Sequence, residues 1–491
     1  MSFRRFVKLF IPKKLFKKIE PFGHLFEAIL FNTLYGFPAR KLKVIGVTGT
    51  NGKTTTCFLI HRMLHEAGYK VGLMTTVAYG AGDNIHSQTY HMTNVTMPAL
   101  MKRLRELKKE GIEWLVLETT SQGLAQNRLF GIPFHLAVMT NVTHEHLDWH
   151  GTFENYRDSK RLLFKRCNRH KRGTQTGIIN AEDSSASLFA SDVQKSILYG
   201  VKKGKLRAKN VKTTPSGSTY TAEISNIKYQ IQCNLPGSFN VYNSLAAVGA
   251  GHVLGLKTEH IEKGIEALKN VEGRMTTIDE GQDFEVIVDY AHTPDSFEKL
   301  FKDIRKIMDS SRASHLDTAQ GSKEEQESRR AATANERETP ADTALRQEPA
   351  SVASSAGQQG KAVRGSGKLI IMFGSAGRRD EAKRPVQGEL AGKYGDELVI
   401  TEEDDRDIDG QQIMDEIATG AEKAGKVREK DLFLVHDRTE AIKFAISRAN
   451  ATDTVLLLGK GHEKTIERVD GERPWDEIAT AHQALQALLN K

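Results

Sequence analysis

A glycine-rich turn near the start of the chain carries the first residues that could do chemistry. VIGV, which ends at Val47, predicts a buried strand, and KTTTCFLIHRMLHEAG predicts the helix that follows it. Gly49 and Gly52 would let phosphate oxygens approach backbone N–H groups at the helix start. Lys53 would add a point charge, and Thr54 would offer a hydroxyl to Mg²⁺. The generic phosphate-loop pattern has glycine where Val47 stands, but strand, loop and helix agree. The predicted nucleotide-binding residues of this loop are Gly49, Thr50, Asn51, Gly52, Lys53, Thr54 and Thr55.

The elements around this loop predict an α/β fold. From Leu42 onward, apolar β-rich runs such as WLVLE and HLAVMTNV alternate with helical patterns, which favours a mostly parallel sheet. Residues 217–235 alternate polar and apolar with period two and predict an antiparallel flank. A second α/β series begins near Gly273 with FEVIVDY and KLIIMFG. We therefore predict three parts, which are a basic N-terminal segment (1–40), a central P-loop ATPase domain with a parallel sheet and antiparallel flank (41–271), and a Rossmann-like α/β C-terminal domain (272–491).

One long segment inside the second series has a different composition. Residues 309–367 are rich in Ser, Ala, Gln, Glu and Arg and contain few large apolar residues. Such a segment cannot bury enough surface to offset the entropy of ordering it. We predict a disordered insertion that the chemistry does not need.

Composition narrows the class of protein. The chain has 491 residues, of which 39% are hydrophobic, so it can bury a large core. Its three cysteines lie far apart with no CxxC pair, which argues against a disulfide framework and a cysteine zinc site. No apolar run reaches the roughly 18–20 residues of a membrane span, and the N-terminus lacks a signal-peptide pattern. We expect a cytoplasmic protein with buried thiols.

The formal net charge of +8 is concentrated near the N-terminus. Seven of the first eighteen residues are Lys or Arg, and no acid appears before Glu20. Because the excess is local, we expect no nucleic-acid partner. Apolar residues recur at helical spacing on either side of Pro12, at Phe3, Phe6, Val7, Phe10, Leu15, Phe16 and Ile19. Two interpretations stay open. Residues 1–20 could lie on the inner, anionic face of a membrane, or a helix pair could pack on the core with its lysines solvated.

Several stretches together resemble the Mur ligases, a family that adds amino acids to peptidoglycan precursors. GVTGTNGKTTT resembles the family's ATP loop, and TNVTHEHLDWHG resembles its central signature, with Glu145 where Asp is usual. NLPGSFNVYNSLAAV, VEGRM and VDYAHTPDSF follow in the family's order. GSAGRRDEAKRP and LLGKGHE resemble the members that add the third residue, a diamino acid, to a muramoyl dipeptide. The similarity covers roughly residues 40–308 and 368–491.

The resemblance implies a ligase that uses ATP and Mg²⁺ to turn a carboxylate into an acyl phosphate, which an amine then attacks. It implies that Glu118, at the end of the strand WLVLE, binds Mg²⁺ with Thr54, and that His146 binds a second Mg²⁺. In the same register Lys160 is carbamylated, because a carbamate supplies the anionic oxygens that Mg²⁺ favours. Taken without the family, the three histidines of HEHLDWH suggest a zinc site, and Lys160 is one solvated lysine among many.

For the nucleotide, the resemblance assigns Asn243 to adenine, Arg274 to the phosphates, and Asp289 with His292 to the ribose and base. Lys383, in DEAKRP, would reach the γ-phosphate from the second domain. That assignment implies that the domains close over ATP.

For the two substrates, the resemblance assigns a group on each domain. The muramoyl-peptide side is held by Thr96, Thr120, Gln126 and Arg128. The incoming amino acid meets Arg379, Asp404, Arg406, Gly459 and Glu463. Members that select meso-diaminopimelate carry Asp-Asn-Pro-Arg, and the matching positions here read Glu403, Asp404, Asp405 and Arg406. Arg406 keeps a planar donor for a distal carboxylate, whereas the extra acid leaves a basic amine such as lysine open.

The phosphate loop begins unusually early for this family. Members of full length carry a domain before it that grips the uridine diphosphate (UDP) end of the precursor, and about forty residues are too few for one. We expect a ligase without that domain, whose acceptor is UDP-linked, UDP-free, lipid-linked or held by a partner. Two other classes remain open, which are a related ligase of the poly-glutamate type and a non-catalytic ATP-binding scaffold.

Overall fold

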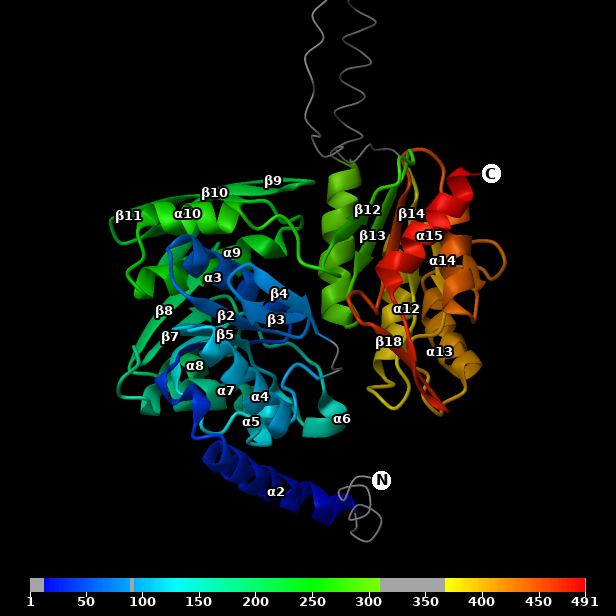
Figure 1. The fold of residues 1–491 in the computed structure, drawn as a ribbon. Helices are drawn as coiled ribbons and strands as arrows, with labels where there is room; N and C mark the ends of the chain where they lie inside the picture. Colours follow the sequence, from blue (N-terminus) through cyan, green and yellow to red (C-terminus); the bar gives the residue numbers. More distant parts are fainter. Residues whose placement is uncertain (1–12, 89–91, 310–366, 491) are drawn as a thin grey trace, which may run out of the picture.

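The structure is a computed structural model that describes residues 13–88, 92–309 and 367–490. The first twelve residues of the predicted basic segment, and residues 310–366 of the predicted insertion, lie outside the described residues. Two sheets, each flanked by helices, form two bodies that stand side by side (Figure 1). Both bodies mix helices with largely parallel strands, so the predicted α/β class is confirmed.

An eleven-stranded sheet organises the central body, in the order β11-β10-β9-β8-β7-β6-β1-β5-β2-β3-β4. The strands from β9 to β2 in this order pair in parallel, while β10 and β11 at one edge and β3 and β4 at the other are antiparallel. The antiparallel flank predicted at residues 217–235 is thereby confirmed. The strands are β1 (Lys43–Thr48), β2 (Val71–Met74), β3 (Ala78–Ala81), β4 (Asn84–Ser87), β5 (Trp114–Glu118), β6 (Phe134–Met139), β7 (Thr176–Asn180), β8 (Lys195–Gly200), β9 (Leu206–Thr214), β10 (Gly217–Ile224) and β11 (Ile227–Cys233).

Helices cover both faces of this sheet. Val44 and Ile45 are neighbours on β1, yet they belong to two separate hydrophobic cores because successive side chains point to opposite faces. Both faces are apolar, which explains why the central strands are continuous hydrophobic runs. The helices are α3 (Lys53–Glu66), α4 (Met97–Lys109), α5 (Ser121–Ala125), α6 (Leu147–His150), α7 (Phe153–Arg169), α8 (Ala186–Ser191), α9 (Phe239–Val253) and α10 (Thr258–Glu266).

The second body has a six-stranded sheet in the order β12-β13-β17-β14-β15-β16. Only β12 runs antiparallel to its neighbour within this sheet. Its strands, with the hairpin β18–β19, are β12 (Thr276–Ile278), β13 (Glu285–Asp289), β14 (Leu369–Phe373), β15 (Glu397–Ile400), β16 (Leu432–Leu434), β17 (Thr454–Leu458), β18 (Thr465–Arg468) and β19 (Gly471–Pro474). Residues 294–309 are helical, and the other helices are α12 (Lys383–Tyr394), α13 (Gly410–Lys423), α14 (Arg438–Ser447) and α15 (Glu477–Leu489).

In the described residues, a long helix and a short 3-10 helix precede the central sheet. α2 (Lys13–Leu34) continues through Pro21 and is followed by the short 3-10 helix η1 (Pro38–Lys41). In Figure 1, α2 lies at the foot of the central body, beside α4. In the described part of the chain, every helix is too short or too polar to cross a membrane.

Candidate active site

The predicted phosphate loop connects the end of β1 to the first turn of α3. Gly52 has φ +80°, a left-handed conformation that glycine adopts at little cost, and a Cβ there would lie 2.2 Å from Asn243 Oδ1. A Cβ on Gly49 would lie 1.9 Å from Thr140 Oγ1. The close approach of neighbouring side chains therefore requires both glycines. The loop leaves backbone N–H groups at the N-terminus of a 14-residue helix, where an anion is stabilised.

A hydroxyl, a carboxylate and two cations gather beside this loop. Val47 pairs with Glu118 across β1 and β5, so Glu118 leaves the sheet next to the loop. Thr54 Oγ1 donates to Glu118 Oε2 at 2.9 Å, and Arg274 lies 3.4 Å from the same hydroxyl. Lys53 Nζ donates to the Thr50 carbonyl at 2.7 Å. Oxygen ligands are what Mg²⁺ prefers, so the Thr54–Glu118 pair fits the predicted metal role.

Lys160 lies directly beneath the loop. Its Nζ donates to the Gly49 carbonyl at 2.6 Å and stands 4.4 Å from the centre of the Tyr156 ring. The side chain is only 2% exposed. Burial, reinforced by the charge of Lys53, lowers the pKa of the Lys160 amine well below its usual range. A buried amine with a depressed pKa is available in its neutral, nucleophilic form.

Glu145 connects the two bodies. Its carboxylate lies 3.3 Å from His292 Nε2 and 3.7 Å from His146 Nε2. Burial raises its pKa, but the neighbouring His146 and His292 outweigh burial and hold the pKa well below its usual range. Burial also lowers the pKa of His146, which leaves an imidazole lone pair available for a metal ion. Glu145 therefore stays ionised where the two bodies meet.

The zinc interpretation of the three histidines is wrong. His144 stacks on Phe153 with ring centres 4.6 Å apart, and His150 Nε2 lies 3.0 Å from Ser121 Oγ. Each imidazole therefore has its own neighbours. Among the described residues, the three do not form a group that could hold a metal ion.

The nucleotide residues of the second body hold its edge against the loop. Asp289 ends β13 and accepts from the backbone N–H groups of Met275 and Ala291 at 2.8 and 2.7 Å. Asn51 donates to Asp295 at 2.9 Å, which is a further contact between the bodies. The sequence prediction missed Asp295, although VDYAHTPDSF contains it. Its acidic side chain after Pro294 was the available signal.

A cavity of about 870 Å³ lies between the two bodies. The residues predicted from the sequence that line this cavity are Thr50, Asn51, Gly52, Lys53, Thr54, Thr55, Glu118, Thr120, Arg128, His146, Asn243, Arg274, Asp289, His292 and Arg379. Nine predicted residues stand outside the lining, namely Gly49, Thr96, Gln126, Lys160, Lys383, Asp404, Arg406, Gly459 and Glu463. Lys383 does not line the cavity but contacts a residue that does, because its Nζ donates to the His292 carbonyl at 3.0 Å.

Two of the predicted acceptor residues, Thr120 and Arg128, are held by Asn94, which the sequence prediction missed. Its Oδ1 accepts from the Thr120 N–H at 2.9 Å and from the Thr120 hydroxyl at 2.8 Å. Its carbonyl accepts from Arg128 at 2.8 Å. Thr96 caps the start of α4, and Gln126 follows α5. Asn94 stands in MTNVTMP beside Thr96, so its position in the sequence was the available signal.

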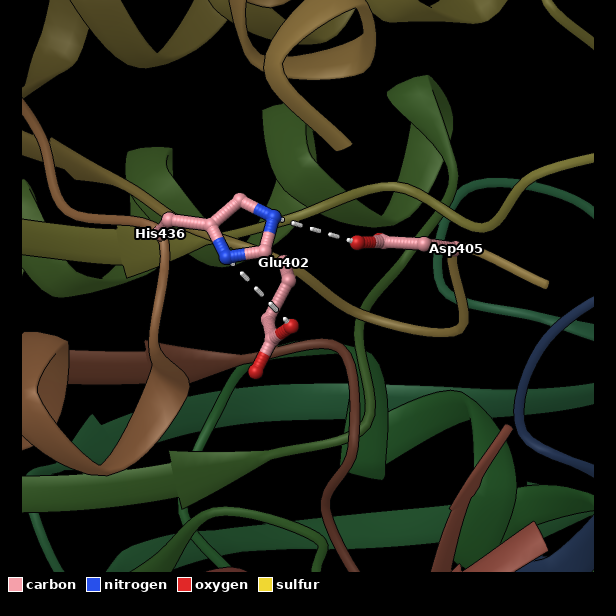
Figure 2. A group of neighbouring side chains, drawn as sticks. All are labelled: Glu402, Asp405 and His436. Atoms are coloured by element: carbon pink, nitrogen blue, oxygen red, sulfur yellow. Dashed lines mark ion pairs between the residues drawn. The ribbon is translucent and has the colours of Figure 1, made fainter. Parts of the chain in front are cut away.

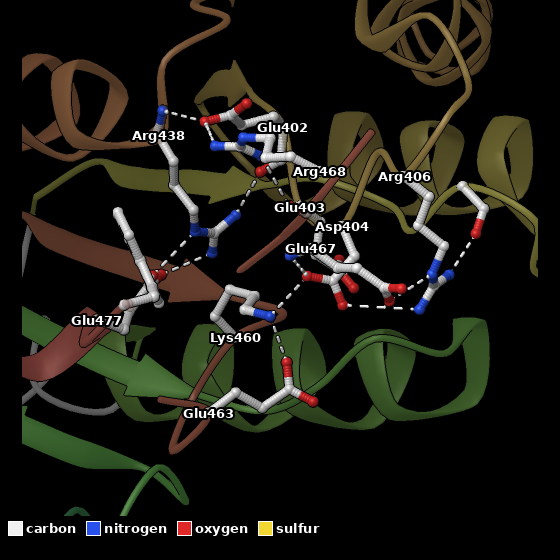
Figure 3. A network of polar contacts seen from close by, with 12 residues as sticks. Glu402, Glu403, Asp404, Arg406, Arg438, Lys460, Glu463, Glu467, Arg468 and Glu477 are labelled. Carbon is white, nitrogen blue, oxygen red and sulfur yellow. Dashed lines mark hydrogen bonds and ion pairs between the residues drawn. The ribbon is translucent and has the colours of Figure 1, made fainter. Parts of the chain in front are cut away.

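Three of the predicted amino-acid residues, Asp404, Arg406 and Glu463, belong to a charged network in the second body (Figure 3). Asp404 accepts from Lys460 at 2.9 Å, and Lys460 also donates to Glu463 at 2.5 Å. Arg406 donates to Glu467 at 2.7 Å and to the Gly377 carbonyl. A Cβ on Gly459, whose φ is +106°, would lie 2.8 Å from Glu403. The cavity wall joins the network through Tyr290, whose hydroxyl donates to Glu463 at 3.0 Å.

A second acidic group adjoins this network (Figure 2). His436 lies between Glu402 and Asp405, 3.9 and 3.6 Å from their oxygens. Arg468 pairs with Glu402, and the N–H of Arg438 donates to the same carboxylate. Burial nevertheless raises the pKa of Glu402, because it outweighs these donors.

The two α/β bodies carry a phosphate loop, oxygen ligands suited to a metal ion, and cations at their junction. Together these features define a nucleotide-dependent enzyme. Residues 47–251 match the Mur ligase middle domain, and residues 348–461 match the Mur ligase glutamate ligase domain. The chain is 35% identical over 473 residues to a UDP-N-acetylmuramyl-tripeptide synthetase of Roseiflexus sp., covering 94% of this chain and 82% of that one.

Two other comparisons agree with this. A UDP-N-acetylmuramoyl-L-alanyl-D-glutamate–2,6-diaminopimelate ligase 1 of Clostridium acetobutylicum is 33% identical, with 92% of this chain and 80% of that chain covered. A solved structure of a diaminopimelate ligase of the same type is 26% identical at a TM-score of 0.55, covering 92% of this chain and 79% of that one. The chain belongs to the Mur ligase family, the ATP-dependent amide-bond ligases of peptidoglycan synthesis.

Proposed function

We propose that this protein adds a diamino acid, as the third residue, to the terminal carboxylate of a muramoyl dipeptide. The observation that carries the proposal is the interdomain cavity, where Lys53, Thr54, Glu118 and Arg274 converge from both bodies. The names of the similar ligases support the choice of substrates. Phosphoryl transfer depends mainly on positioning and charge neutralisation, which such a constellation supplies.

Each residue of the phosphate side has a definable task. The N–H groups of the loop and Lys53 would hold the phosphates of ATP, and Arg274 would neutralise charge from the opposite body. Thr54 and Glu118 would hold Mg²⁺, which supplies positive charge at the transferred phosphoryl group. Asn243, Asp289 and His292 would then face the nucleoside, as the family resemblance implies.

Lys160 is suited to the proposed carbamylation. A neutral amine can add to CO₂ and release one proton, which leaves a carbamate, whereas an ammonium cannot react in this way. The depressed pKa and full burial of Lys160 favour this neutral form. The Gly49 carbonyl that it contacts would have to give up that hydrogen bond. The carbamate and His146 would then hold a second Mg²⁺.

The charged network is the proposed site of the incoming amino acid. Arg406 would bind a distal carboxylate, and the acids Asp404 and Glu463 would bind an ammonium group. Arg379 lines the cavity and would connect the two substrates. Lys383 would reach the γ-phosphate after the bodies close, because its present partner is the His292 carbonyl.

The proposed acceptor enters from the side of Thr120 and Arg128. Its peptide end would meet these residues with Thr96 and Gln126 nearby, while the other end is UDP-linked, UDP-free, lipid-linked or held by a partner protein. We place the protein in the cytoplasm, at the inner membrane face when the acceptor is lipid-linked.

Product analysis tests this proposal. The protein is incubated with Mg-ATP, a pool of diamino acids, and muramoyl dipeptides with and without UDP, and products are identified by mass spectrometry. We expect one diamino acid per acceptor with equimolar ADP. A parallel reaction contains glutamate and a γ-glutamyl acceptor, and addition of glutamate there would instead favour the poly-glutamate alternative.

A loop variant separates an enzyme from a scaffold. Lys53→Ala should lower ligation roughly 1,000-fold, because it removes a cation from the phosphates. Lys102→Ala, an exposed change on α4, serves as the control. Equal ligation by the two variants would contradict the proposed role of the loop.

A further inference from the structure

The helix α2 is amphipathic in the opposite sense to a helix that packs on a core. From Ile19 to Leu34, where its side chains are described, the buried positions are His24, Ala28 and Asn32, which follow one another at a spacing of four. Asn32 fixes this face to the body, since its amide donates to the Phe130 carbonyl at 3.2 Å. The helix thus presents mainly polar and small residues to the protein, and Phe31 packs partly buried against the core beside them.

The opposite face is apolar and exposed. Phe22 is 72% exposed and Phe26 is 70% exposed, one turn apart. The other exposed apolar residues of the helix share their side at spacings of three and four, and they are Ile19, Ile29, Leu30 and Leu34. Single exposed apolar residues are ordinary on proteins, but a contiguous stripe of this kind marks an interaction surface.

The acids and the basic residues of this region differ in their place along the sequence. The acids of α2, Glu20 and Glu27, both lie beside His24, 3.9 and 3.6 Å from its ring nitrogens. They therefore lie toward the buried side of the helix. The sequence before Glu20 holds seven Lys and Arg residues and no acid, and four of these lysines fall within α2 itself.

We infer that α2 docks on an anionic lipid surface, with its apolar face between the headgroups and its basic end against their phosphates. Aromatic and aliphatic residues on one side and an adjoining block of lysines are the features of helices that lie in the membrane interface. The block of positive charge is complementary to an anionic surface, whereas a second copy of this chain would offer the same positive charge.

The contact with Phe130 gives this docking a consequence for the substrate. Phe130 stands two residues after Arg128, which lines the cavity. A membrane under α2 would lie close to the proposed acceptor entrance. This consequence rests on the proposed function, whereas lipid binding by α2 does not.

Vesicle binding tests the inference. The full chain is sedimented with vesicles of phosphatidylglycerol and phosphatidylcholine, and with vesicles of phosphatidylcholine alone. We expect binding to the anionic vesicles that weakens as salt rises. The double variant Phe22→Ser, Phe26→Ser should bind roughly 100-fold more weakly, because two exposed rings no longer enter the interface. Val469→Ser, at a position that is 79% exposed on the second body, is the matched control and should bind like the parent.

Three results would overturn the inference. These are absence of binding to anionic vesicles at low salt, equal binding of the double variant and the parent, and a dimer in sedimentation velocity that the double variant dissolves. The last result would assign the stripe to a second copy. Ligation of a soluble acceptor should be the same for parent and double variant, so a failure of the lipid inference stays distinct from a failure of the proposed function.

Discussion

Two buried lysines, one in each body, are held in opposite ways. Lys160 in the central body and Lys460 in the second body are both almost fully buried. Lys160 has a backbone carbonyl as its hydrogen-bond partner, and burial holds its pKa well below the usual range. Burial also opposes the charge of Lys460, but Glu463 and Asp404 outweigh it and raise the pKa of this lysine. The surroundings of Lys160 disfavour its ammonium form, whereas those of Lys460 favour it.

The same contrast extends to other buried groups. His61 in the central body is buried, and its pKa is lowered to about 4. In the second body, Arg438 is fully enclosed but donates twice to Glu477, at 2.9 and 2.6 Å. Whether a carboxylate stands within hydrogen-bond distance therefore decides the state of each buried base. This arrangement suits reaction chemistry in the first body and charge-based recognition in the second.

Within this comparison, the largest expected loss of activity comes from removing the amine of Lys160. Lys160→Met keeps the length of the side chain without an amine, and it should lower ligation roughly 100-fold or more, since a carbamate could no longer form. The rate of ADP release is measured with and without added bicarbonate. The parent should respond to bicarbonate and the variant should not. Full activity of Lys160→Met with unchanged thermal stability would show that only the shape of the side chain matters.

The next prediction concerns the stability that the buried ion pair of Arg438 and Glu477 gives to the second body. Arg438→Met leaves Glu477 buried without its partner, so the free energy of unfolding should fall by about 3–5 kcal/mol. Urea denaturation provides the measurement. Lys443→Met, which removes an exposed partner of Glu440, should cost less than about 1 kcal/mol. Equal losses in the two variants would contradict the claim that burial gives the Arg438 pair its importance.

Acid pH should weaken the central body through its neutral histidines. Because the folded-state pKa of His61 is about 4, below its ordinary 6.5, the unfolded chain binds a proton in this range that the folded protein does not. Stability is therefore full above about pH 6.5 and falls as the pH is lowered to about 4, by about 3 kcal/mol from this residue. His61→Gln should flatten the pH dependence of unfolding, whereas the exposed change His86→Gln should not. An identical slope in parent and His61→Gln would refute this assignment.

The smallest expected effect concerns Arg406 in the proposed amino-acid site of the second body. Glu467 occupies the guanidinium of Arg406 and so competes with a substrate carboxylate. Glu467→Gln should lower the KM for a diamino acid with a distal carboxylate about threefold, because the exposed pair is weak. The KM for lysine should stay the same. Glu472→Gln, on the neighbouring strand β19, is the control, and a raised KM for both amino acids in the Glu467 variant would count against the proposed role of Arg406.

The fold and the phosphate side of the site could be predicted because their signals are local in sequence. Strands buried on both faces are continuous apolar runs, and the loop from Gly49 to Thr54 is contiguous. Asp295 was missed because its contact with Asn51 joins residues 244 positions apart. The zinc interpretation failed for the related reason that spacing along the chain does not show where each imidazole points. The apolar face of α2 was also beyond prediction, because periodicity alone cannot tell which side of a helix meets the protein.

Isotope transfer tests the central claim most directly. The acceptor is prepared with ¹⁸O in its terminal carboxylate, and the phosphate released during ligation is examined by mass spectrometry. If the carboxylate takes the phosphoryl group from ATP, and the amine then attacks the carbonyl carbon, each phosphate should leave with one ¹⁸O atom from the acceptor. Phosphate without ¹⁸O, alongside AMP that carries the label, would contradict the account.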